Sequence, residues 1–150
     1  MPNWVDNRLV VQGPAQSLRG FVERAKGQDP LYQDHGEGKL QVFSFHALWP
    51  VPLNVLEERY SHFGFYWELN QWGCKWGASD SSMEVFSLNK VVYVFDTPFG
   101  PPVLLVSNLA VEFDDLHFTL SYEGDEFVGL VRFSRGLFVE SRHRRKSQEG

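Results

Sequence analysis

Residues 90–96, Lys-Val-Val-Tyr-Val-Phe-Asp, place five consecutive apolar side chains between two charged ones. A short apolar run bounded in this way is typical of an interior strand that is buried on both faces. We therefore predict a strand over residues 91–95 at the centre of a sheet, with the side chains of Val92 and Val94 buried.

The residues that follow this run predict a helix and a hairpin. After a proline-rich turn, apolar residues recur with helical spacing over residues 103–113, which places Leu109 and Phe113 on a buried face. Residues 116–123 then alternate apolar and polar side chains, as a strand with one buried face does. A turn at residues 123–126, a returning strand over 127–133 and a last short strand over 137–140 complete the pattern.

The part of the chain before residue 90 begins with a predicted strand and a predicted helix. A strand over residues 8–12 stops at Gly13-Pro14, and a helix follows to residue 25 with Leu18 and Phe21 on its apolar face. Residues 28–39 have the composition of a loop. A strand over 40–48 and a helical turn over 53–60 are expected next.

The order of these segments is strand, helix, strand, a long insertion, strand, helix, strand and an added hairpin. It predicts an α+β, ferredoxin-like sandwich, in which two helices cover one face of an antiparallel sheet. We expect one domain over residues 1–140 with a Trp/Gly-rich insertion at about 49–90. We expect the polar, basic residues 141–150 to form a disordered tail.

Composition limits the classes of function. The chain has 150 residues, of which 43% are hydrophobic and 15% aromatic, so it can build a core without disulfides or metals. Its single cysteine, Cys74, and the absence of a signal-like or membrane-spanning apolar run favour a cytoplasmic protein. The net charge of −5, with basic residues gathered near the C-terminus, disfavours broad binding of nucleic acid by the rest of the chain.

The sequence contains no recognisable catalytic or metal-binding pattern. The five histidines have no helical pairing and only one cysteine accompanies them, so we expect no metal and no cofactor. Cys74 has no local base partner and is interpreted as a small residue in a packed turn. The Gly73 to Gly77 segment lacks the order of a phosphate-binding loop, and its glycines are interpreted as sites of close backbone approach beside Trp72 and Trp76. We therefore expect no enzyme.

Three motifs in order resemble one family. They are Pro2-Asn3-Trp4 with Asn7-Arg8-Leu9, then Trp72-Gly73-x-Lys75-Trp76, then Phe95-x-Thr97-x-x-x-Pro101-Pro102 leading to Leu109-Ala110-x-x-Phe113. Together they resemble the YubB ferredoxin-like family of phage and plasmid proteins. The resemblance implies a ferredoxin-like fold and a mobile-element origin, and it brings no established catalytic residues.

The interpretation favoured by these observations is a non-enzymatic protein that binds and modulates a host protein with a basic surface. Transcription machinery, such as RNA polymerase or its sigma factor, and host defence complexes are the candidate partners. Trp49, Phe99 and Trp76 are the candidate partner-binding residues, because they lie in loops beside prolines or glycines.

The alternative is a domain that binds single-stranded nucleic acid or nucleotides through exposed rings and the basic C-terminal residues. Its candidate residues are Arg142, Arg144, Arg145 and Lys146.

Overall fold

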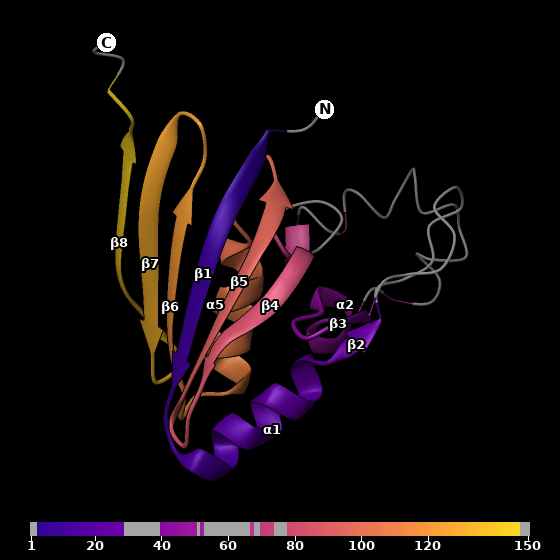
Figure 1. Cartoon of the computed structure of the whole chain (residues 1–150). Helices are drawn as coiled ribbons and strands as arrows, with labels where there is room; N and C mark the ends of the chain where they lie inside the picture. The colour runs from indigo at the N-terminus through magenta and orange to yellow at the C-terminus, as the bar shows by residue number, and fades with distance from the viewer. Residues whose placement is uncertain are drawn as a thin grey trace.

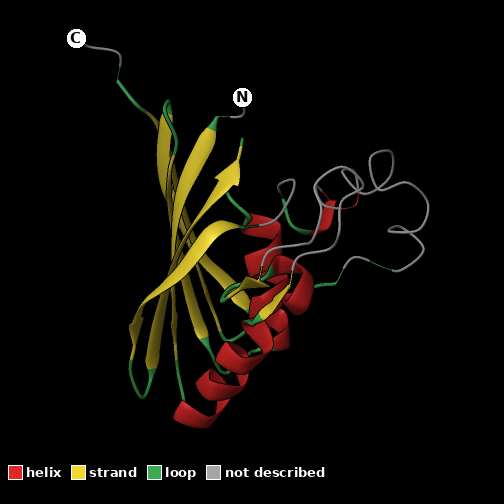
Figure 2. Ribbon diagram, turned by 45° about the vertical axis from the view of Figure 1, so that its right-hand side comes forward, coloured by secondary structure: helices red, strands yellow, loops and turns green. Residues whose placement is uncertain are grey.

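The computed structural model describes residues 3–28, 40–50, 52, 67, 70–73 and 78–147. Within these residues the fold is α+β, with a six-stranded antiparallel sheet that carries its helices on one face (Figures 1 and 2). The strand order is β4, β5, β1, β6, β7, β8, and a separate small sheet pairs β2 with β3. The element bounds are β1 Trp4–Gln12, α1 Ala15–Ala25, β2 Gly27–Gln28, β3 Leu40–Gln41, α2 Phe45–Leu48, β4 Ser79–Phe86, β5 Lys90–Pro98, α5 Val103–Glu112, β6 His117–Glu123, β7 Phe127–Ser134 and β8 Leu137–Arg145.

The first strand, β1, lies between β5 and β6 and pairs antiparallel with both. Leu9, for example, faces Tyr93 on one side and Leu120 on the other. The strand begins at Trp4, four residues before the predicted start, because the alternation of buried and exposed side chains continues through Val5 and Asn7. This extension brings Asp6 into the sheet.

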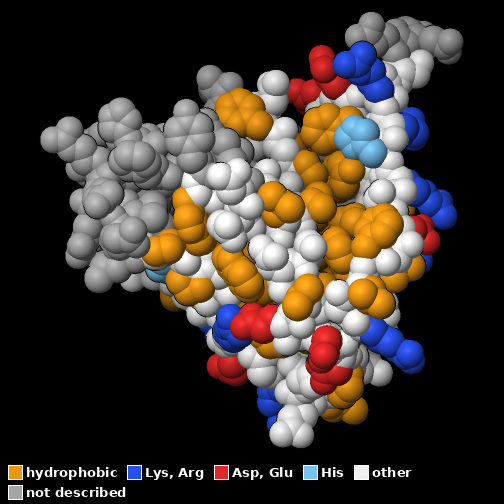
Figure 3. Space-filling view, turned by 180° about the vertical axis from the view of Figure 1, so that it is seen from behind, with side chains coloured by type: hydrophobic (Ala, Val, Ile, Leu, Met, Phe, Trp, Pro, Cys, Tyr) orange, Lys and Arg blue, Asp and Glu red, His pale blue; other side chains and the backbone are white. Residues whose placement is uncertain are grey.

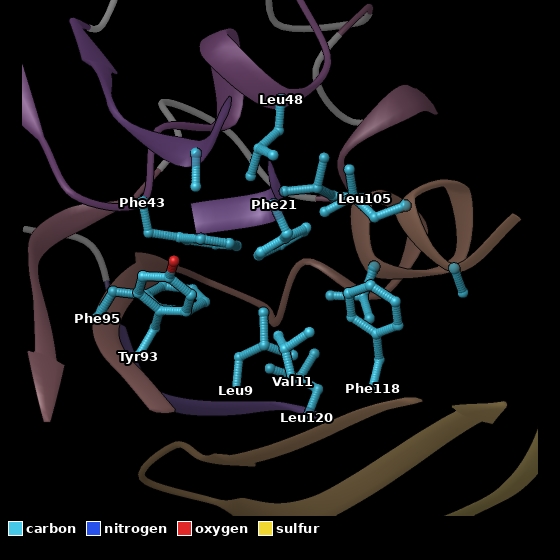
Figure 4. Packing of buried hydrophobic residues seen from close by; sticks show 14 of the residues in the cluster. Leu9, Val11, Phe21, Phe43, Leu48, Tyr93, Phe95, Leu105, Phe118 and Leu120 are labelled. Atoms are coloured by element: carbon cyan, nitrogen blue, oxygen red, sulfur yellow. The ribbon is translucent and has the colours of Figure 1, made fainter. Parts of the chain in front are cut away.

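The two long helices agree with the sequence prediction and supply the core. Leu18 and Phe21 of α1 and Leu109 of α5 are fully buried, and so is Val92. The Phe21 ring lies 5.6 Å from the Phe118 ring and 6.3 Å from the Tyr93 ring, centroid to centroid, so α1 packs directly on the sheet (Figure 4). The prediction of full burial was wrong for the other two residues: Phe113, beneath the Arg24 guanidinium, and Val94 are half-buried.

The position of β5 explains the exposure of Val94. The strand is interior, between β4 and β1, as predicted, but helices cover only one of its two faces (Figure 2). Tyr93 and Phe95 point into the core, whereas Val94 lies on the opposite, uncovered face. The prediction of burial on both faces therefore holds at Val92, which is fully buried on the same face as Val94, and was wrong at Val94.

Two other segments differ from the sequence prediction. Residues 40–48 form only two residues of strand before α2, because the Ser44 hydroxyl accepts a hydrogen bond from the Ala47 backbone N–H at 3.1 Å and caps a helical turn there. The segment assigned to the insertion contains β4, which pairs with β5 along the edge of the sheet. The sequence of β4 is mostly polar and lacks the apolar alternation from which strands are predicted.

The Trp/Gly-rich segment contributes Trp72 to the core. This side chain is 1% exposed, and its indole N–H donates to the Trp49 carbonyl at 3.0 Å. Gly73 has a left-handed φ of 89°, and a β-carbon there would lie 3.3 Å from the Leu104 backbone nitrogen. Tight approach to α5 therefore favours glycine, as predicted. Residues 74–77, residues 29–39 of the loop predicted over 28–39 and the predicted helical turn at 53–60 lie outside the described residues, whereas Gln28 belongs to β2.

The C-terminal segment is not the disordered tail that the sequence predicted. Residues 141–145 continue β8 and pair with β7 as far as Phe127, which faces Arg145. The backbone N–H of Lys146 then donates to the Glu126 carbonyl at 2.8 Å. The long β7 strand offers backbone partners along this stretch, and their hydrogen bonds order a polar sequence that has little apolar surface to bury.

Candidate functional site

The uncovered face of the sheet is hollowed at the end where the described chain begins and ends. Figure 1 looks onto this face, with α5 behind the sheet. The hollow has a volume of about 520 Å³ and is formed by β1, β5, β6 and β7 with one residue of β4. Its lining includes small or apolar residues, such as Val94, Ser121 and Val128, and the charged residues Asp6, Arg8, Asp80, Asp96 and Glu123. We call this hollow the acidic groove.

Three carboxylates cross the groove in one row. Asp6 of β1 faces Asp96 of β5 on one side and Glu123 of β6 on the other. Residues that face each other across neighbouring strands lie on the same side of the sheet, and like charges in such positions repel. Asp80 lies beside the row, next to Ser79, which faces Asp96. The fold thus gathers negative charge at one place on an otherwise accessible face.

The electrostatics of the row show in the pKa of Asp96. Burial raises the pKa of this carboxyl above its ordinary value, and a side-chain hydrogen bond with Asp6 and the charges of Asp6 and Asp80 raise it further. The hydrogen bond requires one carboxyl of the pair to carry a proton, and the nearby negative charges favour that protonated form. A cation in the groove would favour the ionised form instead.

Among the described residues, Arg8 and Lys146 form ion pairs at the groove. Arg8 Nη1 lies 2.7 Å from Glu84 Oε2, and Lys146 Nζ lies 2.6 Å from Glu123 Oε2. The hydrogen bond from Lys146 and its charge lower the pKa of the Glu123 carboxyl. These pairs compensate Glu84 and Glu123, so the Asp6 and Asp96 pair remains the acidic centre of the groove.

Aromatic side chains lie near the acidic centre. Trp4, on the same face of β1 as Asp6, is 40% exposed, and Phe99, just beyond the end of β5, is 56% exposed. Phe99 has a left-handed φ of 69°, and its backbone N–H donates to the Asn3 carbonyl at 2.7 Å. This turn is fixed further at Thr97, whose hydroxyl donates to the Gly100 carbonyl at 2.7 Å.

The structure places the sequence-predicted partner-binding residues in different surroundings. Phe99 is exposed near the groove, whereas Trp49 is half-buried against the core, with its indole N–H 3.3 Å from Gln71 Oε1. Neither Phe99 nor Trp49 is among the residues that line the groove. Trp76 lies outside the described residues.

The predicted basic residues lie on β8 or directly after it. Arg142 faces Leu130 and Arg144 faces Val128, so both share the uncovered face with the groove. Arg145 faces Phe127, and Lys146 is paired with Glu123. Arg142, Arg144 and Lys146 therefore lie on the side of the sheet that carries the groove, whereas Arg145 faces Phe127 on the other side.

Sequence reasoning missed the carboxylate row. Asp6 lay before the predicted start of its strand, and Asp96 and Glu123 were interpreted as strand ends. The signal in the sequence is an acidic residue at the same end of three predicted strands, but only the strand register places the three side by side. Among the described residues, no group of three histidine, cysteine or acidic side chains is arranged to hold a metal ion.

Comparison with known proteins gives a fold relation. No family model and no curated protein sequence matches the chain. The structure is similar to the crystal structure of the protein api92 from Yersinia pseudotuberculosis, described with the family DUF1281, with a TM-score of 0.73. The superposition covers 99% of this chain and 100% of that chain, at 11% sequence identity. The two proteins share a fold. Within the described residues, no helix is both long and apolar enough to cross a membrane.

Proposed function

We propose that the protein is a non-enzymatic binding domain that docks its acidic groove on a basic surface of a host protein and modulates that protein. The observation that carries the proposal is the row of Asp96, Asp6 and Glu123 across neighbouring strands. Carboxylates placed together in this way repel one another and oppose folding. A cation supplied by a partner would relieve this repulsion, and the relief would favour binding.

The groove has the size and polarity for the side chains of a protein partner. Its volume of about 520 Å³ admits lysine or arginine side chains, and Val94 and Val128 can contact their aliphatic stems. Trp4 and Phe99 supply exposed rings near the acidic centre, and such rings are common anchors of interfaces. Negative charge would steer a basic partner toward this face, and the rings would hold it there.

The identity of the partner is proposed from the family resemblance. The order β4, β5, β1, β6, with α1 and α5 as crossovers, supports a ferredoxin-like core, and the motifs resemble the YubB family of phage and plasmid proteins. We infer a cytoplasmic protein of a mobile element that acts on a host complex. RNA polymerase with its sigma factor and defence complexes are candidates, since both present basic surfaces that bind nucleic acid.

The proposal is tested by affinity capture from nuclease-treated host lysate with three baits. The first is the wild type, the second carries Asp6→Asn and Asp96→Asn, and the third carries Glu23→Gln and Asp114→Asn. The third bait loses the same charge from exposed positions outside the groove. We expect a protein that the first and third baits retain and the second loses. Identical capture by all three baits would refute docking through the groove.

One observation favours the alternative of single-stranded nucleic-acid or nucleotide binding. Arg142 and Arg144 are exposed on the uncovered face of β8, beside the groove. A nucleic acid lying across that face would pair its phosphates with these side chains and stack a base on an exposed ring. The same capture experiment separates the two proposals, because a partner held through nucleic acid is lost on nuclease treatment.

A further inference from the structure

The strand β8 forms an open edge of the sheet (Figure 1). It is nine residues long, and its first three side chains are apolar and exposed: Leu137 by 69%, Phe138 by 60% and Val139 by 53%. The view from behind shows basic and apolar side chains gathered along this side of the molecule (Figure 3). An edge strand of this length offers backbone hydrogen bonds to another strand, and its apolar side chains would gain from being covered.

The opposite edge of the sheet differs. The strand β4 has two register shifts against β5, whereas β8 has one against β7, between Arg132 and Phe133, so the pairing of β4 is the more interrupted. It is also joined to the small sheet, since the Ser81 backbone N–H donates to Gln41 Oε1 at 3.1 Å. Bulges and covering segments of this kind protect an edge from pairing with a further strand. Among the described strands, β8 is therefore the edge better suited to add another strand.

The sequence of β8 is complementary to itself. When two antiparallel copies are aligned so that Ser141 faces Ser141 of the second copy, Glu140 faces Arg142 of the second copy, and the reverse pair forms by symmetry. Glu140 and Arg142 face Arg132 and Leu130 of β7, so both lie on the uncovered face of the sheet.

Within one chain, Glu140 and Arg142 form an ion pair that no hydrogen bond in the described part of the chain completes. Glu140 Oε1 lies 3.3 Å from Arg142 Nε, but it accepts no hydrogen bond from the described residues. The Arg142 side chain is 77% exposed. A second copy would offer each carboxylate a cross-strand guanidinium. In this register Leu137 and Phe138 face Arg145 and Arg144 of the second copy, whose aliphatic stems can cover them.

We propose that the protein forms a symmetric dimer in which two β8 strands pair antiparallel about Ser141. The two-fold axis lies perpendicular to the sheet, because antiparallel pairing of identical edges keeps the same face of both copies on the same side. The two sheets become one continuous sheet. Both acidic grooves then face the same direction, so the dimer would present two grooves to one partner surface.

The dimer is tested by sedimentation equilibrium of the full-length protein with charge exchange. We expect the wild type to dimerise and the single variants Glu140→Arg and Arg142→Glu each to raise the dimer dissociation constant about tenfold or more, since each opposes like charges twice. An equimolar mixture of the two variants restores both ion pairs and is expected to form a heterodimer. The variant Arg19→Glu, with the same charge change on the exposed face of α1, should leave the dissociation constant unchanged.

Each result decides the proposal. A wild-type chain that stays monomeric up to its solubility limit would overturn the dimer. It would do so even if β8 pairs with an extended segment of another protein. A dimer that both single variants preserve would overturn this register. Variants that melt like the wild type, are monomeric alone and fail to combine when mixed would overturn the pairing of Glu140 with Arg142. Heterodimer formation only in the mixture supports the proposal.

Discussion

At the scale of single residues, the ionised carboxyl of Asp96 lowers the stability of the fold but favours the proposed binding of a basic partner. Its carboxyl is partly buried, faces Asp6 across the strands and has a raised pKa because burial and the nearby carboxylates disfavour its charge. The unfolded chain does not bear this cost. Carboxyl groups with a perturbed pKa are more frequent at functional sites than elsewhere.

Substitution of this residue should stabilise the protein at neutral pH. We expect Asp96→Asn to raise the melting temperature by about 1–3 °C, the range for removing one repulsive cross-strand pair. Because the folded pKa is above the unfolded one, the cost of the ionised Asp96 is fully present above the folded pKa. It disappears as the pH falls from the folded pKa to the ordinary value. Thermal melts of both proteins at several pH values measure the difference.

Glu123 provides the matched contrast for this prediction. The hydrogen bond from Lys146 lowers its pKa, so its ionised form stabilises the folded protein above the ordinary pKa, and that contribution is lost as the pH falls through the lowered value. Glu123→Gln should therefore leave the melting temperature unchanged or lower it at neutral pH. A rise for Glu123→Gln equal to that for Asp96→Asn would show that net charge, and not the position of Asp96, governs stability.

At the scale of elements, the hairpin of β7 and β8 depends on a glycine. Gly129 faces Tyr122 in β6 and His143 in β8. A β-carbon at this position would approach the Tyr122 hydroxyl and lie 2.5 Å from the Arg142 carbonyl oxygen. The Tyr122 hydroxyl and His143 Nδ1 are hydrogen-bonded at 2.9 Å, and the His143 ring stacks on Phe127. The absent side chain allows this arrangement.

The effect of a side chain at Gly129 on stability can be compared with that of the same substitution at a glycine whose surroundings are open. We expect Gly129→Ala to lower the free energy of unfolding by about 1–3 kcal/mol, the usual cost of overpacking. Gly20→Ala in α1 meets no atom within 4 Å and should raise it by up to about 1 kcal/mol, because alanine favours the helix. Urea denaturation gives both values. Equal effects of the two substitutions would contradict the packing described for β7.

Two variants distinguish the contribution of the β8 backbone to stability from that of its charged side chains. Deletion of residues 141–150 should lower the melting temperature, since it removes the pairing of residues 141–145 with residues 127–131 of β7 and the ion pair of Lys146 with Glu123. A full-length variant keeps the strand when Gln replaces its four basic residues, Arg142, Arg144, Arg145 and Lys146. Its melting temperature should be closer to that of the wild type than the melting temperature of the deletion variant is. A deletion without effect on the melt would return residues 141–150 to the disordered tail that the sequence predicted.

The elements predicted well from sequence are those whose apolar pattern has a regular period. The helix α1 is recognisable because Leu18 and Phe21 follow the spacing of one helix face, and α5 because of Leu109. The strand β4 was missed because an edge strand with exposed side chains needs no apolar alternation. The end of β8 was missed because arginines resemble a solvated tail unless the pairing strand is known.

At the scale of the whole molecule, the decisive feature is that the helices leave one face of the sheet uncovered (Figure 2). The acidic groove and the open-face side chains of β8 lie on that face, and the proposed dimer would place two such faces side by side. The order of elements predicted helices on one face, but not which polar residues meet on the other. Asp6, Asp96 and Glu123 are brought together only by the register of three strands from distant parts of the chain.

The most direct test of the acidic groove is an NMR titration of the isotope-labelled protein with two probes, a lysine- and arginine-rich peptide and a single-stranded oligonucleotide. We predict that the peptide shifts the amide signals around Asp6, Asp96 and Glu123, that these shifts decrease at higher salt, and that they are lost in the Asp6→Asn, Asp96→Asn protein. Shifts caused by the oligonucleotide alone, centred on Arg142 and Arg144, would contradict the account and favour nucleic-acid binding.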